Sequence, residues 1–339
     1  MQPHKHFRNL NYRPAKRMSS NQNPTSYRLS PVITDTVFPM LERILNILTL
    51  ATAPGLPISI GFVILTSSQE NRLFLILSLL ATVLCALGLF ARFVAPRQLR
   101  VTTLRIPNLP LRVAYFSDLH VNRIKGAAWV EQVVDLINRQ KPDVILFGGD
   151  FYGHPGALPL AGLLAPLAKL RAPMGVFAVF GNHDHGLHDH DRTDRPDELR
   201  ALLPKLGITL LHNQSISLSP PGVTSPVRLV GVGELWANDD NAEQAFASCE
   251  KNDIILVLAH NPDLMDKISQ HATLFLFGHT HAGQIYLPFA PGLGVPIRGR
   301  LYRGEFHLPQ GRVYVGAGCG EASLTARLGT WPEIILIQG

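Results

Sequence analysis

Cysteine is scarce in this sequence. The 339 residues contain three cysteines, an odd number without a Cys-x-x-Cys pair: Cys85, Cys249 and Cys319. A disulfide framework pairs its cysteines and a cysteine zinc site needs neighbouring thiolates, so neither is indicated. An ordinary hydrophobic core therefore has to stabilise the chain, which is long enough for one large or two modest domains.

The N-terminal tail lacks the marks of an export signal. Residues 1–36 are rich in Asn, Ser, Pro, Lys and Arg and show no apolar periodicity. No apolar stretch follows the charges directly, which excludes an ordinary signal peptide, and no Arg-Arg pair supports twin-arginine export. We expect residues 1–36 to form a disordered basic tail.

The segment from Arg92 to Arg112 contains no acidic residue, and the whole chain carries a net charge of +6. Much of the Lys and Arg lies before Arg112, so the positive charge is not spread over the main domain. This distribution argues against a nucleic-acid partner and favours basic segments that flank a membrane.

Long apolar runs are present, and they are confined to residues 37–95. The first run, Ile44–Leu65, is interrupted by Pro54 and Pro57, and the second, Leu73–Phe90, carries no charge. Each is close to the ~20 residues that cross a bilayer as a helix. We expect a two-helix transmembrane hairpin over 37–95; the alternative is a buried helical hairpin in a soluble protein.

The charges on either side of the hairpin predict its orientation. A basic tail precedes it, Arg72 is the one basic residue in the turn, and five arginines without an acid follow: Arg92, Arg97, Arg100, Arg105 and Arg112. By the positive-inside rule both ends of the hairpin face the cytoplasm. The domain that follows is then cytoplasmic and held against the membrane.

After an expected linker at 96–110, residues 111–339 show an α/β pattern. Apolar strands at Leu111–Phe116, Asp143–Phe147 and Gly175–Phe180 alternate with helical segments at Ala127–Arg139 and Ala157–Leu170. Alternation of this kind predicts a mostly parallel sheet. Shorter apolar runs follow at closer spacing and suit a second, mixed sheet: Val227–Val232, Ile254–Ala259, Thr273–Phe277, Arg312–Ala317 and Glu333–Ile337. We expect two packed mixed sheets flanked by helices.

Polar side chains that bind metals follow five of these strands. The residues are Asp118 and His120, Asp150, Asn182 and His183, His260, and finally His279 and His281. Residues two apart in extended backbone point the same way, so each pair of that spacing can converge on one site. Open α/β sheets place ligands at this carboxyl edge.

Each of these residues alone has a simpler interpretation. Asp150 after two glycines fits a turn or a helix cap, and a lone His260 fits a hydrogen-bonded edge histidine. Their occurrence in one order makes coincidence improbable. Carboxylate, amide and imidazole without thiolate suit Mn, Fe or Zn. Seven candidate ligands are more than one tetrahedral ion can take, and they are about the number that two ions need.

The motifs resemble those of the calcineurin-like metallophosphoesterase superfamily. Its pattern is Asp-x-His, Gly-Asp, Gly-Asn-His-Asp/Glu, a lone His and Gly-His-x-His, and all five blocks occur here in order between Asp118 and His281. The chain is most similar to the membrane-anchored bacterial branch, although Ala282 stands where that branch usually has Gly. The resemblance implies a four-layer sandwich and a protein of the inner membrane.

The resemblance also implies a role for each residue. Asp118, His120 and His281 would hold one metal ion, Asn182, His260 and His279 the other, and Asp150 would bridge them. Two such ions clamp a phosphate and activate a bridging water. His183 resembles the histidine that lies beside the leaving group without binding metal.

The resemblance implies a membrane-tethered phosphodiesterase or phosphomonoesterase. Protein phosphatases of this superfamily carry a second acid and an Arg after Gly-Asp, and Phe151-Tyr152-Gly153 replaces them here, which argues against phosphoprotein substrates. The tether suggests a lipid-linked phosphoester drawn from membrane lipids. Two alternatives remain open: a hydrolase of soluble nucleotide phosphodiesters, and an inactive metal-binding membrane adaptor.

Overall fold

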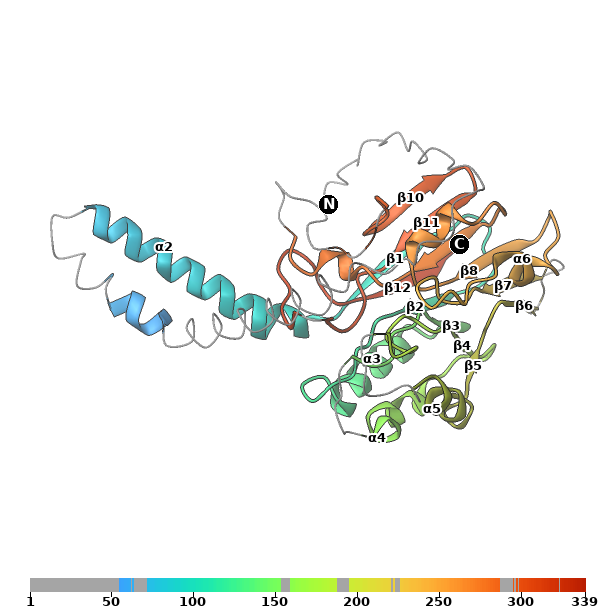
Figure 1. Ribbon diagram of the computed structural model, residues 1–339, viewed down its shortest axis with the longest axis horizontal. Coiled ribbons are helices and arrows are strands. Elements are labelled where there is room, and N and C mark those ends of the chain that lie inside the picture. The colour runs from blue at the N-terminus through green and yellow to red at the C-terminus, as the bar shows by residue number, and fades with distance from the viewer. Residues whose placement is uncertain are drawn as a thin grey trace.

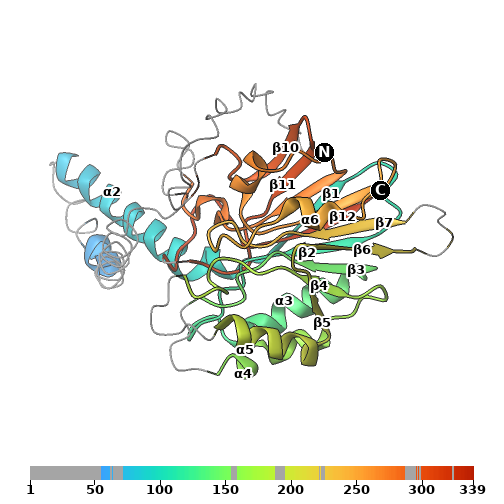
Figure 2. The same ribbon diagram turned by 45° about the vertical axis from the view of Figure 1, so that its right-hand side comes forward.

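The computed structural model describes residues 55–61, 63, 72–153, 159–187, 195–220, 222, 226–286, 295, 297, 299–322 and 324–339. The long helix α2 (Arg72–Leu89) projects from one side of an α/β domain (Figure 1). In that domain two six-stranded sheets pack together, and short helices lie on their outer faces (Figure 2).

The first sheet is mixed and has the strand order β1-β12-β2-β3-β4-β5. Strands β2 to β5 run parallel, and β12 is antiparallel to β2 and parallel to β1. The strands are β1 (Arg100–Arg105), β2 (Val113–Phe116), β3 (Val144–Phe147), β4 (Val176–Ala178), β5 (Ile208–Leu210) and β12 (Glu333–Gln338).

The second sheet is also mixed, with the order β10-β11-β9-β8-β7-β6. Its four central strands are parallel, and β10 and β6 are antiparallel at its edges. The strands are β6 (Gln214–Leu218), β7 (Val227–Gly231), β8 (Ile254–Leu258), β9 (Leu274–Phe277), β10 (Gly304–Leu308) and β11 (Gly311–Val315).

Three hydrophobic clusters define the layers. One fills the space between the sheets, where side chains such as Leu146 and Leu256 are fully buried. The second joins the first sheet to its helices, and the third covers the outer face of the second sheet. The central strands are buried on both faces, which explains their continuous apolar sequences. The expected architecture of two mixed sheets flanked by helices is confirmed.

The helices follow the amphipathic pattern only in part. Helix α3 (Ala127–Arg139) buries an apolar stripe that includes Val130, Val134 and Ile137, at spacings of three and four residues. The helix expected at Ala157–Leu170 is divided at a proline into α4 (Leu160–Leu164) and η4 (Ala165–Lys169). Further helices of the domain, later in the described chain, are α5 (Arg195–Leu202), η5 (Leu203–Leu206), α6 (Ala242–Phe246), η6 (Pro262–Asp266) and η7 (His281–Gly283).

Two segments lie elsewhere than expected. The run Glu333–Ile337 was assigned to the second sheet, but β12 inserts between β1 and β2 of the first. The range 96–110, expected as a linker, contains β1, whose register joins Arg100 to Glu333 and Arg105 to Gln338. Short apolar runs do not encode their partner strand, because strand pairing depends on tertiary contacts.

One helix in the described part of the chain is long and apolar enough to cross a membrane. The span covers Leu75–Arg97, with a mean hydropathy of 2.2 and 6% of its most apolar stretch buried. Most of the other predicted segment, Ile44–Leu65, lies outside the described residues, so the two-helix hairpin stays a prediction.

The end of this helix is tied to the domain. After α2 come η2 (Phe90–Val94) and η3 (Ala95–Arg97). The Lys125 ammonium donates to the carbonyl of Pro96 at 2.9 Å, and the backbone N–H of Arg327 donates to the carbonyl of Ala91 at 2.8 Å. Burial lowers the pKa of Lys125 to about 8, and Glu321 at 2.9 Å opposes that shift. The helix therefore enters the domain through fixed contacts rather than a loose linker.

Candidate metal centre

The carboxyl ends of five strands meet at one edge of the sandwich. Strands β2, β3 and β4 are neighbours in the first sheet, and β8 and β9 are neighbours in the second. All eight residues selected from the sequence follow these strands, and the structure brings them into one cluster. Parallel pairing aligns the strand ends within each sheet, and face-to-face packing of the sheets brings the two sets together.

One group comprises Asp118, His120 and His281. The Nε2 atoms of the two histidines lie 3.0 Å apart, and the Asp118 Oδ1 atom is 3.6 Å from His281 Nε2 and 3.9 Å from His120 Nε2. One ligand atom from each residue lies within 4.8 Å of the others. The group is buried and has the composition of a metal site.

The second group comprises Asp150, His260 and His279, whose ligand atoms also lie within 4.8 Å of one another. Asn182 completes it, since its Oδ1 atom is 2.8 Å from His279 Nδ1 and 3.2 Å from His260 Nε2. All four residues are buried.

The Asp150 carboxylate lies between the two groups. Its Oδ2 atom is 3.3 Å from His120 Nε2 and 3.2 Å from His260 Nε2. Burial favours the neutral acid, but the charges of His260 and His183 outweigh it and hold the pKa of Asp150 well below its usual value. Burial likewise favours neutral His260, yet Asp150 raises the pKa of that histidine well above its ordinary value. The carboxylate thus requires positive charge beside it.

The histidine orientations fit a cation. The Nδ1 atom of His260 is 2.7 Å from the carbonyl of Gly148, which can only accept, so Nδ1 carries the proton. In the neutral ring Nε2 then presents a lone pair to the oxygens of Asp150 and Asn182, both at 3.2 Å. Lone pairs that face one another at this distance repel unless a proton or metal ion lies between them. A hydrogen bond that fixes the tautomer in this way is typical of metal-binding histidines.

His183 differs from the other histidines of the cluster because it is only partly buried. Its backbone N–H donates to Asp150 Oδ1 at 3.0 Å, and its ring stands edge-on to that of His120 with centroids 4.7 Å apart. It also forms a possible ligand group with His120 and Asp150. The side chain is therefore beside the cluster and accessible from outside.

The backbone is left-handed at five of the cluster residues. Their φ angles are positive at Asp118 (53°), His120 (45°), Asp150 (60°), His279 (68°) and His281 (51°). This conformation is unfavourable for residues other than glycine and concentrates at functional sites. The sharp turns bring side chains from extended strands onto one point.

Glycines make room for the two carboxylates. A Cβ atom at Gly181 would collide with Asp150 Oδ1, and one at Gly278 would lie 2.5 Å from Asp118 Oδ2. The glycines of the Gly-Asn-His and Gly-His-x-His motifs are therefore needed for close packing against a carboxylate.

Sequence reasoning gave no role to Asp184, which the structure shows at the centre of these turns. Its fully buried carboxylate accepts from the N–H groups of Asp150 at 2.8 Å, Phe151 at 2.9 Å and Gly181 at 2.9 Å. Burial and the nearby Asp150 charge raise the pKa of Asp184, and the Gly181 and Phe151 donors oppose that shift. The motif Gly-Asn-His-Asp contains this residue, but only the fold reveals its partners.

Sequence reasoning also missed the role of Arg327, which organises the loop behind the cluster. The side chain is fully buried, and its Nη2 atom donates to the carbonyls of Ala317 at 2.8 Å and Gly320 at 2.5 Å. The Gly320 carbonyl is also 3.2 Å from His281 Nδ1. Arg327 thus supports a group that orients His281.

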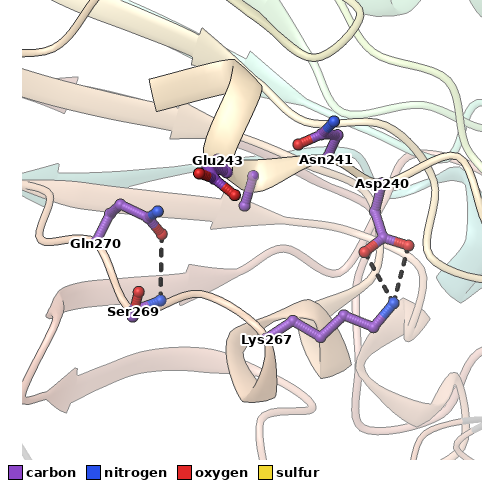
Figure 3. A pocket seen from close by; sticks show the side chains of 7 residues that line it. Asp240, Asn241, Glu243, Lys267, Ser269 and Gln270 are labelled. Carbon is purple, nitrogen blue, oxygen red and sulfur yellow. Dashed lines mark hydrogen bonds and ion pairs between the residues drawn. The ribbon is translucent and has the colours of Figure 1, made fainter. Parts of the chain in front are cut away.

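A separate surface depression lies beside α6 and η6 (Figure 3). Its charged pair is Lys267 and Asp240, with the ammonium 2.8 and 3.0 Å from the two carboxylate oxygens. None of the eight cluster residues lines it. The depression is therefore distinct from the candidate centre.

A two-sheet sandwich with a buried His/Asp cluster that could hold metal fits a metal-dependent phosphoester hydrolase, and the sequence comparisons support that class. The sequence profile of the calcineurin-like phosphoesterase family matches residues 111–283, about half of the chain. The chain belongs to this family, as the motifs predicted.

Curated relatives agree with this assignment. Phosphodiesterase YaeI of Escherichia coli is 31% identical over 68% of this chain and 82% of its own length. UDP-2,3-diacylglucosamine pyrophosphatase LpxG of Chlamydia trachomatis is 29% identical over 74% of this chain and 92% of its own. A "transmembrane protein with metallophosphoesterase domain" of Bos taurus is 28% identical over 76% of this chain and 60% of its own length.

Removal of the Asp184 carboxylate is expected to destabilise the domain. Asp184→Ala leaves three buried N–H groups without their acceptor, and each unsatisfied group costs ~1–3 kcal/mol. The thermal midpoint of the purified full chain should fall by at least ~5 °C. The control Asp135→Ala, at an exposed position of α3, should change it little. An unchanged midpoint for Asp184→Ala would show that these hydrogen bonds are not structural.

Proposed function

We propose that the chain is a binuclear-metal phosphoesterase. Asp118, His120 and His281 hold one ion, and Asn182, His260 and His279 hold the other. Asp150 bridges the two. The observation that carries this proposal is the position of Asp150 Oδ2, 3.3 Å from His120 Nε2 and 3.2 Å from His260 Nε2. Oxygen and imidazole donors without thiolate favour Mn, Fe or Zn.

When bound, two such ions supply Lewis acidity toward phosphoryl oxygens. The chain contributes the positions of the surrounding groups. Asp118 accepts the N–H of His279 at 3.0 Å, which links the two ligand groups across the sheets. Asp184 holds the Asp150 turn, and Arg327 supports the loop behind His281. These contacts fix the positions of the residues that would hold the ions, and a fixed site can orient a phosphoester.

His183 is the proposed proton donor to the leaving group. It is less buried than its neighbours, and its backbone N–H is fixed by Asp150 Oδ1. Histidine is the side chain that most often transfers a proton to or from a reacting group. The ring can therefore face the alkoxide that departs from phosphorus.

The proposed substrate is a lipid-linked phosphodiester or phosphomonoester. The support is the exposed apolar helix α2 next to the domain and the relation to LpxG, which is named as a UDP-2,3-diacylglucosamine pyrophosphatase. A hydrolase of soluble nucleotide phosphodiesters is the main alternative, in which the helix only localises the enzyme. A catalytically inactive adaptor is less favoured, because every motif residue is present in the cluster.

We propose two membrane spans with the catalytic domain in the cytoplasm. The charge pattern, with Arg72 alone in the turn, motivates this topology. A reporter fused after Arg100 should be active only as a cytoplasmic reporter, and one inserted within Ser67–Arg72 only as a periplasmic reporter. Periplasmic activity of the Arg100 fusion would move the domain to the other side of the membrane.

Loss of the bridging carboxylate should empty both metal positions. Asp150→Asn removes the charge that offsets repulsion between the ions, whereas His120→Ala removes one ligand of one ion. Metal analysis of the full chain loaded with Mn should find two ions in the wild type, close to none in Asp150→Asn and about one in His120→Ala. Two ions retained in Asp150→Asn would contradict the bridging role.

His183→Ala should retain both ions and lose rate according to the leaving group. A general acid contributes roughly 10²–10⁴-fold, and mainly when the leaving group is a poor one. The kcat for an alkyl phosphodiester should fall by that factor, and the kcat for bis(p-nitrophenyl) phosphate far less. Equal losses for both substrates would mean that His183 acts by positioning, and loss of metal would make it a ligand.

A further inference from the structure

An exposed isoleucine lies close to the metal centre. Ile124 is 64% exposed, and every other exposed large hydrophobic side chain in the described residues lies between Ile58 and Val94. An isolated exposed aliphatic residue is common on soluble proteins. The position of Ile124 relative to the membrane helix distinguishes it.

Ile124 is next to the point where the helix enters the domain. Its neighbour Lys125 is buried and donates to the carbonyl of Pro96 at 2.9 Å. Two residues before Pro96, Val94 is 42% exposed, and Phe93 beside it is 47% exposed. The Lys125–Pro96 contact thus joins the segment that carries Phe93 and Val94 to the turn 122–125, which carries Ile124.

Basic and aromatic side chains lie on the helical segment, on the turn and on the strand β1 that follows the helix. Arg97 and Arg123 are exposed, one on each side of the junction. The Arg100 guanidinium lies 3.8 Å from the centre of the Trp331 ring, and Phe90 packs edge-on against the same ring at 6.1 Å. Arginine and tryptophan are typical of the level of lipid headgroups, and cationic side chains there attract anionic lipids.

The turn is a direct extension of the metal centre. The side chain of Asn122 donates to the carbonyl of His120 at 3.0 Å and accepts the N–H groups of Ile124 and Lys125, both at 2.8 Å. The Lys125 ammonium also contacts the carbonyl of Cys319 at 3.0 Å, in the loop that supports His281. Ile124 therefore lies in a fixed turn, four positions after His120 of the cluster.

We propose that the turn 122–125, together with Phe93 and Val94, inserts into the headgroup region of an anionic bilayer. Ile124 is the inserted side chain, and Arg97 and Arg123 contact the lipid phosphates. This surface holds the metal centre at the bilayer, so a phosphoester reaches it while its acyl chains stay in the membrane. That consequence rests on the proposed phosphoesterase function, but the insertion itself does not.

The insertion is tested with the full chain in lipid nanodiscs. An environment-sensitive fluorophore is placed at Ile124→Cys, and at Lys205→Cys as a control, in a Cys85→Ser/Cys249→Ser background that retains buried Cys319. Lys205 is exposed in η5, which comes directly before β5. Strands β5 and β1 lie at opposite edges of the first sheet. Lipids spin-labelled near the headgroup should quench the label at 124 and leave that at 205 unaffected. Equal quenching at both positions would overturn the proposal.

The consequence for catalysis is tested with two diesters that share a leaving group. One is diacylglycerol p-nitrophenyl phosphate in nanodiscs that contain phosphatidylglycerol, and the other is soluble bis(p-nitrophenyl) phosphate. Ile124→Asp should lower kcat/KM for the lipid diester at least tenfold, and kcat/KM for the soluble diester less than twofold. Ile124→Leu should keep kcat/KM for the lipid diester close to the wild-type value. Equal losses on both diesters, or none on the lipid, would overturn the role in presentation.

Charge reversal provides a matched pair of variants. Arg123→Glu should lower kcat/KM for the lipid diester in phosphatidylglycerol nanodiscs more than in phosphatidylcholine nanodiscs, and Lys205→Glu should change neither. Equal effects of the two variants would contradict a headgroup contact at Arg123. If the wild type hydrolyses neither diester, the proposed phosphoesterase function fails, whereas the quenching result still decides whether the turn inserts.

Discussion

A buried carboxylate between two histidine groups is the constraint on which the centre depends. Asp150 is 1% exposed and lies within 3.3 Å of imidazole nitrogens from both sheets. A buried charge is costly unless opposite charge accompanies it. The two sheets must therefore keep their packing for His120 and His260 to stay beside Asp150. The core between the sheets consequently serves the site as well as the stability of the fold.

The same constraint explains the unusual backbone of the strand ends. Extended strands cannot aim several side chains at one point without sharp turns, and the left-handed residues provide them. Each such residue costs of order 1–3 kcal/mol, so other contacts have to compensate. Asp184 does this for Asp150, since its carboxylate accepts the N–H groups of Asp150, of Phe151 beside it and of Gly181. The hydrogen bonds that Asp184 accepts therefore help to stabilise the unfavourable backbone conformation at the site.

The sequence predicted the architecture and the cluster well, because both depend on local patterns. Apolar runs that end in Asp118 or His279 identify strands and their carboxyl ends without reference to the rest of the chain. The sheet of β12, the strand β1 within 96–110 and the role of Arg327 were not predictable in this way. Each depends on a partner far away in sequence, as in the hydrogen bond from Arg327 to Ala91. Pairings of this kind follow from tertiary packing alone.

Those distant pairings also join the long apolar helix to the site. The loop that contains Gly320 contacts Asp118 and His281 on one side, and Arg327 links it to the helical segment that follows α2 on the other. Lys125 adds a second link, from Pro96 to the turn after the first strand-end motif. A flexible linker would let the domain rotate freely relative to α2, whereas these contacts fix the two relative to each other. Under the proposed membrane span, the helix would therefore determine which face of the domain meets the bilayer, and the turn after His120 is bonded to the same end of the helix through Lys125.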